Sequence, residues 1–299
     1  MNVHSMADGV SRTVRGKEAS EPVVPRAPRR RHVLTRICLG WLVLVVGLAV
    51  AADVLPLSGY AHVIGPPKLP PFQGELDLLL GTDELGRSML SRCVHGAQAS
   101  LLVGGIAGVL GFGIGTVLGL VAGYFRGRAD AVISVVTDAM LAFPPLILLL
   151  VLATVLTPSV PTLLVSLTLL VIPSFVRLAR ANALAWSTRE FVLAARNMGA
   201  SDLRILVREV LPNTVAPIAT YLPIVIAALI VAEGSLSYLG LGIPPPTPSW
   251  GGMVAGGQDA MATAPYLVFV PATVLFLTVF VLNQLGDHLR SRFDRSLED

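Results

Sequence analysis

Two acidic residues, Asp138 and Glu233, lie within strongly apolar stretches of this sequence. A charge in hydrocarbon costs at least a few kcal/mol, so such residues usually face water or protein. Each acid could line a polar pathway or make a hydrogen bond between helices, and the sequence leaves both alternatives open. We do not expect a proton pump, because no partners for a proton relay lie nearby in the sequence.

Other reactive residue types are sparse. The five histidines are scattered, and no His/Cys cluster has the spacing of a metal site. No nucleophile–base pair stands out in the apolar stretches, and the Gly-x-x-x-x-Gly-Lys-[Ser/Thr] phosphate loop is missing. We therefore expect no catalysis, no ATP hydrolysis and no bound metal or cofactor. Cys38 and Cys93 belong at different depths, which predicts no disulfide.

The segment 191–213, FVLAARNMGASDLRILVREVLPN, is polar and basic between two apolar runs. Apolar side chains recur at helical spacing in both of its halves: Phe191, Ala194, Ala195 and Met198, then Leu203, Leu206, Val207 and Val210. Gly199 permits a tight turn between the halves. Ser201 is placed to cap the second helix, and Pro212 should end it. This pattern predicts an amphipathic helical hairpin.

Three functions would suit such a hairpin. It could lie on the lipid surface as an amphipathic helix. It could read DNA as a helix-turn-helix, although a membrane would crowd the duplex. It could also be a docking loop for a cytoplasmic partner, in which case the partner would move both flanking membrane spans together.

The elements that position these residues are membrane helices. The chain is 54% hydrophobic and 14% charged, with a mean hydropathy of +0.73. Several apolar runs approach the ~20 residues that cross a bilayer. We predict an all-α polytopic membrane protein with six spans: 37–57, 97–125, 131–156, 159–185, 216–240 and 266–285.

The positive charges orient these spans. Nineteen of the 22 Lys and Arg residues fall before span one, after span two, from Arg177 near the end of span four to Arg208, and at the C-terminus. Only Lys68, Arg87 and Arg92 fall on the other side. The positive-inside rule therefore places both termini and the hairpin in the cytoplasm.

We divide the chain into four parts. A disordered basic cytoplasmic tail, 1–35, precedes a first span with an external segment, 36–96. A core domain, 97–290, contains the loop 190–213, and a cytoplasmic tail, 291–299, follows. A cleaved secretory signal is the alternative for the N-terminus. Glycines repeat every four residues in span two, which predicts close helix packing.

Three motifs resemble one protein family. AARNMGASDLRILVREVLPN, 194–213, is similar to the coupling loop of ATP-binding-cassette importer permeases. LGTDELGRSMLSR, 80–92, and LSYLGLGIPPPTPSWGGM, 236–253, resemble the outer segments of the dipeptide and oligopeptide members. From about residue 33 to about 295, the chain resembles their C-type permease subunit. Leu193, Glu209, Leu78 and Leu79 depart from the family pattern.

The resemblance implies type I importer architecture in the bacterial inner membrane. It implies a second homologous permease subunit, two ATP-binding subunits or domains that hold ATP and Mg, an external solute-binding protein and the lipid membrane as partners, with no nucleic acid. The implied coupling residues are Ala194, Ala195, Arg196, Gly199, Ala200, Asp202, Arg208, Leu211 and Pro212. The implied binding-protein contacts are Asp83, Glu84, Arg87 and Trp250. The implied cargo is a peptide, with nickel, haem or a sugar as alternatives. An ATP-independent secondary transporter is the other function that stays open.

Overall fold

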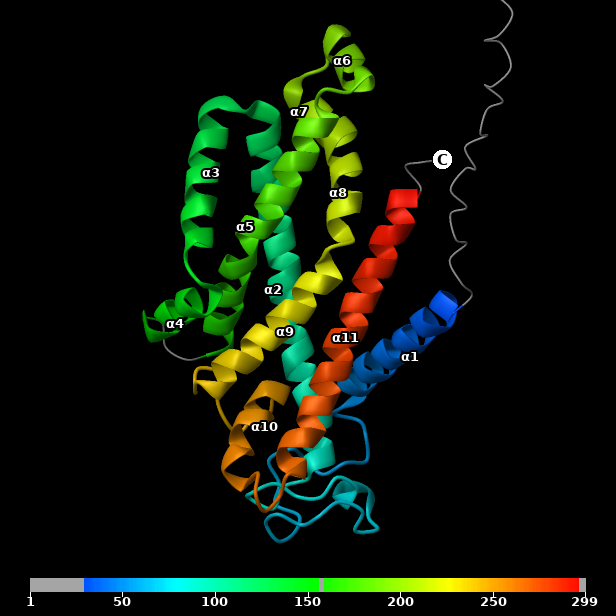
Figure 1. Ribbon diagram of the computed structural model, residues 1–299, viewed down its shortest axis with the longest axis vertical. Helices are drawn as coiled ribbons and strands as arrows, with labels where there is room; N and C mark the ends of the chain where they lie inside the picture. Colours follow the sequence, from blue (N-terminus) through cyan, green and yellow to red (C-terminus); the bar gives the residue numbers. More distant parts are fainter. Residues whose placement is uncertain (1–29, 156–158, 296–299) are drawn as a thin grey trace, which may run out of the picture. The chain divides into compact units, whose positions relative to one another are not determined.

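Long helices dominate the computed structural model, which describes residues 30–155 and 159–295 (Figure 1). Four of them are long and apolar enough to cross a membrane. They are α1 (Arg30–Ala51), α2 (Met89–Phe125), α5 (Val160–Trp186) and α11 (Tyr266–Arg295). Two bent helix pairs raise the number of candidate spans to as many as six. The described residues form no β-strand longer than an isolated bridge. The all-α membrane fold is therefore confirmed.

Several helix ends differ from the predicted bounds: α1 ends at Ala51 instead of residue 57, whereas α5 agrees with its prediction to within one residue. Helix α2 begins eight residues early because the Ser88 hydroxyl caps it, accepting a hydrogen bond from the Ser91 amide at 3.1 Å. Helix α1 already includes residues 30–35, and α11 continues to Arg295. The predicted boundaries after residues 35, 96 and 290 therefore fall inside helices. The rest of both predicted tails, 1–29 and 296–299, lies outside the described residues.

The core of residues 35–295 is the seam between α2 and α5, which lie side by side in Figure 1. Four glycines of α2 face α5 along this seam: Gly111, Gly115, Gly119 and Gly123. A Cβ atom added to Gly119 would lie only 2.5 Å from the Ala179 Cβ atom and 2.5 Å from the Val176 carbonyl oxygen. The two backbones can approach this closely only because α2 presents glycine. The predicted close packing is confirmed.

The third predicted span is broken into α3 (Gly127–Ala142) and α4 (Pro145–Val155), which meet at 95°. Phe143 is extended at the break (φ −82°, ψ 134°) because the ring of Pro144 disfavours a helical residue before it. Two ion pairs fasten α3 to α5. Arg180 binds Asp130 through both carboxylate oxygens, at 2.5 and 2.7 Å, and Arg177 binds Asp138 at 2.7 Å.

The fifth predicted span is also bent. The helix that enters this span begins before its predicted start at residue 216. It runs through α7 (Asp202–Ile205), the π-helical turn η2 (Leu206–Val210) and α8 (Leu211–Ala219), and α9 (Leu222–Tyr238) follows at 51°. The prediction that Pro212 ends the second hairpin helix is wrong. Proline lacks an amide N–H and crowds the carbonyl one turn before it, and the wide π turn relieves that conflict. The helix therefore continues into the span.

The segments that enclose the other end of α2 lie far from the hairpin (Figure 1). One is the loop 52–88 with the short helix η1 (Leu76–Leu78). The other is 239–265, with α10 (Trp250–Gly256) and η3 (Gln258–Ala260). Met89 and Cys93 of α2 pack there against Met253, Ala264 and Leu267. Both cysteines of the chain are buried and free.

Candidate functional site

The predicted hairpin is present, with α6 (Glu190–Asn197) as its first helix. The α6 C-terminus forms a Schellman motif. The Ala200 amide donates to the Ala195 carbonyl at 3.1 Å, and the Gly199 amide donates to the Arg196 carbonyl at 3.0 Å. Gly199 takes the left-handed conformation that this motif requires, with φ +82°. The spacing of Ala195, Gly199 and Ala200 therefore encodes one specific turn.

The hairpin has two apolar surfaces, whereas the sequence predicted one. The inner surface is buried and packs on Leu120 and Tyr124 of α2 and on Ala183 of α5. It consists of Val192, Ile205, Leu206 and Val210. The outer surface is exposed and consists of Phe191, Leu193, Met198, Leu203 and Val207. The inner surface fixes the hairpin to the bundle, and the outer surface stays available.

Tyr124, at the end of α2, joins both halves of the hairpin. Its hydroxyl donates to Asp202 Oδ1 at 2.7 Å and accepts from Arg196 Nη2 at 3.1 Å. The Arg196 guanidinium also lies 5.7 Å from the centre of the Tyr124 ring. The hydrogen bond to Tyr124 raises the pKa of Arg196 above its ordinary value. Nothing in the sequence pattern pointed to Tyr124.

The implied coupling residues divide between those that pack against the inner surface and those exposed around it. Ala195, Ala200 and Leu211 are half-buried against the inner surface. Ala194, Arg196, Asp202, Arg208 and Pro212 are exposed. Ser201 stands at the N-cap of α7, but its hydroxyl makes no capping hydrogen bond, contrary to the prediction. A hollow of about 270 Å³ opens between the helices, with Met198, Arg204 and Glu209 on its walls.

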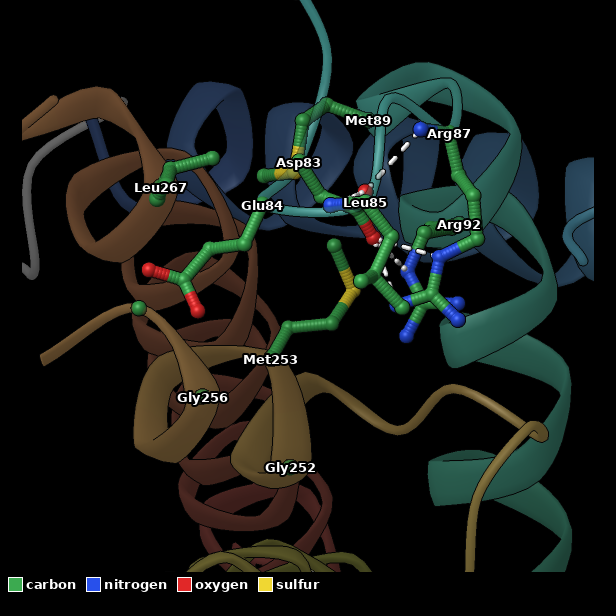
Figure 2. A pocket seen from close by; sticks show the side chains of 11 residues that line it. Asp83, Glu84, Leu85, Arg87, Met89, Arg92, Gly252, Met253, Gly256 and Leu267 are labelled. Atoms are coloured by element: carbon green, nitrogen blue, oxygen red, sulfur yellow. Dashed lines mark hydrogen bonds and ion pairs between the residues drawn. The ribbon is translucent and has the colours of Figure 1, made fainter. Parts of the chain in front are cut away.

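A second cavity, of about 250 Å³, lies at the opposite end of the bundle (Figure 2). Asp83 stands between Arg87, whose Nη2 lies at 2.6 Å, and Arg92, whose Nε lies at 3.3 Å. Asp83 Oδ1 also accepts from the amides of Leu85 and Arg87 at 2.9 Å each. Glu84 is exposed at the rim and pairs with Lys68 at 3.2 Å. Glu84 and part of Arg87 can therefore reach a partner, while Asp83 holds the turn together.

The rest of this outer motif is structural. The buried Thr82 hydroxyl accepts from the Leu69 amide at 2.9 Å and donates to the Pro66 carbonyl at 2.7 Å. Gly86 has φ +77°, and an added Cβ atom would lie 2.1 Å from the Gly65 carbonyl oxygen. The Gly-Thr-Asp-x-Leu-Gly-Arg pattern thus encodes a fold of the outer loop.

Trp250 does not fit its expected role as a surface contact. Its side chain is 0% exposed, and its Nε1 donates to the Cys93 carbonyl at 3.0 Å. The Trp250 side chain therefore holds α10 against α2 by burial and by this hydrogen bond. The sequence could not show this, because an aromatic residue in an outer loop serves equally as anchor or contact.

Glu233 is linked to the Trp250 amide through the Ser100 hydroxyl and is also 0% exposed. Its carboxylate accepts from Ser237 Oγ at 2.7 Å, Ser249 Oγ at 2.8 Å and Ser100 Oγ at 3.4 Å. These serines come from α9, the start of α10 and α2. Of the two open alternatives, the structure gives Glu233 the interhelical hydrogen bonds.

Asp138 also has an interhelical partner, Arg177 of α5, but both side chains remain 60% exposed. The two acids are therefore far from equivalent, since one is sealed in the core and the other is open. Among the described residues, no group of three or more His, Cys, Asp or Glu side chains could hold a metal ion.

Residues 115–297 match the family described as the binding-protein-dependent transport system inner membrane component. A putative peptide transport system permease protein of Brucella abortus is 38% identical over 279 residues, 93% of each chain. A di/tripeptide transport system permease protein of Pseudomonas aeruginosa is 38% identical over 226 residues, 76% of this chain and 75% of its own length.

A glutathione transport system permease protein of Pectobacterium atrosepticum is 38% identical over 219 residues, 73% of each chain. An inward-facing structure of the MetNI methionine ABC transporter has the same fold, with a TM-score of 0.57 and 20% identity. The match covers 68% of this chain and 97% of that one. The chain therefore belongs to the inner-membrane components of binding-protein-dependent transport systems, the non-catalytic permease subunits of ABC importers.

Proposed function

We propose that this chain forms half of the translocation pathway of an ATP-driven importer of di- and oligopeptides. In this proposal a second, homologous permease subunit forms the other half, and an external binding protein delivers the solute. Two cytoplasmic ATP-binding subunits hold ATP and Mg. The peptide assignment rests on the relatives that are named for peptide, di/tripeptide and glutathione transport.

The observation that carries the proposal is the outer apolar surface of the hairpin. Met198 at its tip is 82% exposed, and Leu203 beside it is 69% exposed. The inner surface is firmly packed on α2 and α5, and the second hairpin helix continues into α8. A protein that grips the outer surface would therefore move α5 and α8 together. We propose that this protein is the ATPase and that the outer surface of the hairpin binds in a groove of it.

Coupling then follows from two-state gating. ATP binding closes the ATPase pair and carries the hairpin with it, so the membrane helices turn toward an outward-open state. Hydrolysis resets the inward-open state. Each step needs only a difference in free energy between two conformations of the hairpin and its attached helices.

The proposal also sets the orientation of the chain in the membrane. The hairpin, Arg126 and Arg128 after α2, and the end of α11 carry the positive charges that the cytoplasmic side favours. The loop 52–88 and α10 then face the binding protein, with Glu84 and Arg87 as contacts. Both termini lie in the cytoplasm of a bacterial cell in this arrangement.

The proposal is tested by ATP-driven uptake of a dipeptide into proteoliposomes that contain this chain and its partner subunits. We expect Met198→Glu to lower ATPase binding by at least about tenfold, because it buries an unpaired charge in the contact. Met198→Leu keeps an apolar contact of similar volume and should keep uptake.

Two outcomes would overturn this function. Uptake that needs no ATP would favour the secondary transporter. Full coupling in Met198→Glu would show that the outer surface of the hairpin does not dock the ATPase. Uptake of nickel, haem or a sugar in place of a peptide would keep the mechanism and change the cargo.

A further inference from the structure

A cavity of about 520 Å³ lies at the break between α8 and α9. That break falls on the half of the bundle that carries the hairpin (Figure 1). Side chains of α5, of both helices at the break and of α11 line the cavity. Its volume lies within the roughly 300–1,000 Å³ range of small-molecule sites. None of the residues that form the hairpin or the outer pocket takes part in it.

The helix break makes this wall polar. Pro217 and Pro223 cannot donate the backbone hydrogen bonds that a continuous helix would make there. The break also frees the Pro217 carbonyl, because the Tyr221 amide bonds to Ile218 instead, and the Thr220 hydroxyl donates to that carbonyl at 2.7 Å. Thr220 and Tyr221 both line the cavity. Broken helices with exposed backbone are tolerated at membrane depth where they border a water-filled space.

The cavity also carries an excess of positive charge. Arg177 and Arg290 line it, from α5 and α11. Arg177 is neutralised by Asp138, but Arg290 has no ion-pair partner among the residues that the structure describes. Asp287, one turn before Arg290 on α11, is not among the lining residues. The Arg177 and Asp138 side chains are both 60% exposed in this chain. Because charged side chains in a membrane usually face water or protein, this side of α5 is not expected to face lipid.

We propose that this cavity is a transient binding site for the free carboxylate of the transported solute, with Arg290 as its principal contact. Guanidinium groups bind carboxylates through paired, charge-assisted hydrogen bonds. Tyr221 and Phe293 supply aromatic surface for a solute side chain, and Thr220 supplies a hydroxyl. The inference rests on the proposed function and adds the chemical group by which the inner half of the pathway holds its cargo.

The test is equilibrium binding of radiolabelled alanyl-alanine to the assembled, nucleotide-free transporter in nanodiscs, without the binding protein. We expect Arg290→Gln to weaken binding by about tenfold, the usual loss for a hydrogen-bonded charge. Arg290→Lys should recover part of it. Arg292→Gln is the matched control, because Arg292 is exposed on the same helix and does not line the cavity.

A second probe isolates the carboxylate. The C-terminal amide of alanyl-alanine should compete poorly with the free acid in the wild type and should bind equally to the wild type and Arg290→Gln. Equal binding of acid and amide to the wild type, or an unchanged affinity in Arg290→Gln, would refute the site.

An anionic lipid headgroup offers similar chemistry, so the measurement is repeated in zwitterionic and anionic nanodiscs. Unchanged dipeptide binding in anionic lipid supports a solute site. Displacement of the dipeptide by anionic lipid in the wild type, and not in Arg290→Gln, would make the cavity a lipid site instead. ATP-driven uptake by the wild type is measured in parallel. If that uptake fails, the proposed function fails, whereas intact uptake with unchanged binding rejects the carboxylate site alone.

Discussion

Tyr124 ties the hairpin to a third helix that the sequence motif does not mention. Its hydroxyl contacts both Asp202 and Arg196, and its ring packs with the inner surface of the hairpin. We expect Tyr124→Phe to keep the ring packing and lose both hydrogen bonds. Because Asp202 and Arg196 are half-exposed or more, the loss should be about 1 kcal/mol.

We therefore expect Tyr124→Phe to import about fivefold less solute per ATP hydrolysed, the equivalent of that free energy. The measurement is the ratio of solute uptake to phosphate release in proteoliposomes. Tyr238→Phe, at an exposed tyrosine outside the hairpin, is the control. An unchanged ratio in Tyr124→Phe, with normal assembly, would show that the Tyr124 hydrogen bonds do not contribute to coupling, which would then run through α5 and α8 alone.

At the residue scale, the sequence predicted the structure of a turn where only a few residue types can adopt the required backbone conformation. The turn at Gly199 needs a left-handed residue, and Ala195 and Ala200 follow from its spacing. The partners of Tyr124, Trp250 and Asp138 could not be predicted. Each partner lies at least 39 positions away in the sequence, and no local pattern encodes which distant residue is met.

At the scale of elements, apolar runs predicted where helices lie but not where they bend. Proline breaks the helix at Phe143, whereas Pro212 sits inside a continuous one. The difference is the local backbone. Phe143 has two prolines after it and becomes extended, while the π turn before Pro212 accommodates a single ring. Helix ends were missed for a related reason, because capping and packing extend α2 and α11 beyond their apolar cores.

The α2–α5 seam gives the prediction at this scale. In Gly119→Val, the new side chain would overlap the Ala179 Cβ atom and the Val176 carbonyl, so the helices must separate. Overpacking of this kind costs about 1–3 kcal/mol. We expect a lower melting temperature and a lower yield of folded protein by fluorescence-detected size exclusion. Gly113→Val is the matched control on the same helix, since no atom lies within 4 Å of its added Cβ. Equal stability of the two variants would contradict the close packing of α2 against α5 at Gly119.

At the scale of the whole molecule, residues 35–295 have two functional ends. The hairpin stands at one end, and the loop 52–88 with α10 stands at the other (Figure 1). Four candidate spans and two bent pairs separate them. The proposed mechanism requires that these ends face opposite sides of the membrane, the hairpin toward ATP and the outer loop toward the binding protein. The distribution of positive charge predicts the same orientation.

This orientation is tested by cysteine labelling. The natural Cys38 and Cys93 are 2% and 6% exposed, so they give little background. Phe72 in the outer loop is 79% exposed, and Met198 at the hairpin tip is 82% exposed, so both can be replaced by cysteine with little loss of packing. In intact cells whose outer membrane has been permeabilised, a membrane-impermeant maleimide should label Phe72→Cys and spare Met198→Cys. Labelling of Met198→Cys should require disruption of the inner membrane. The reverse pattern would put the hairpin outside the cell, where it could not contact a cytoplasmic ATPase. Labelling of both positions from outside would show that the six-span arrangement is wrong.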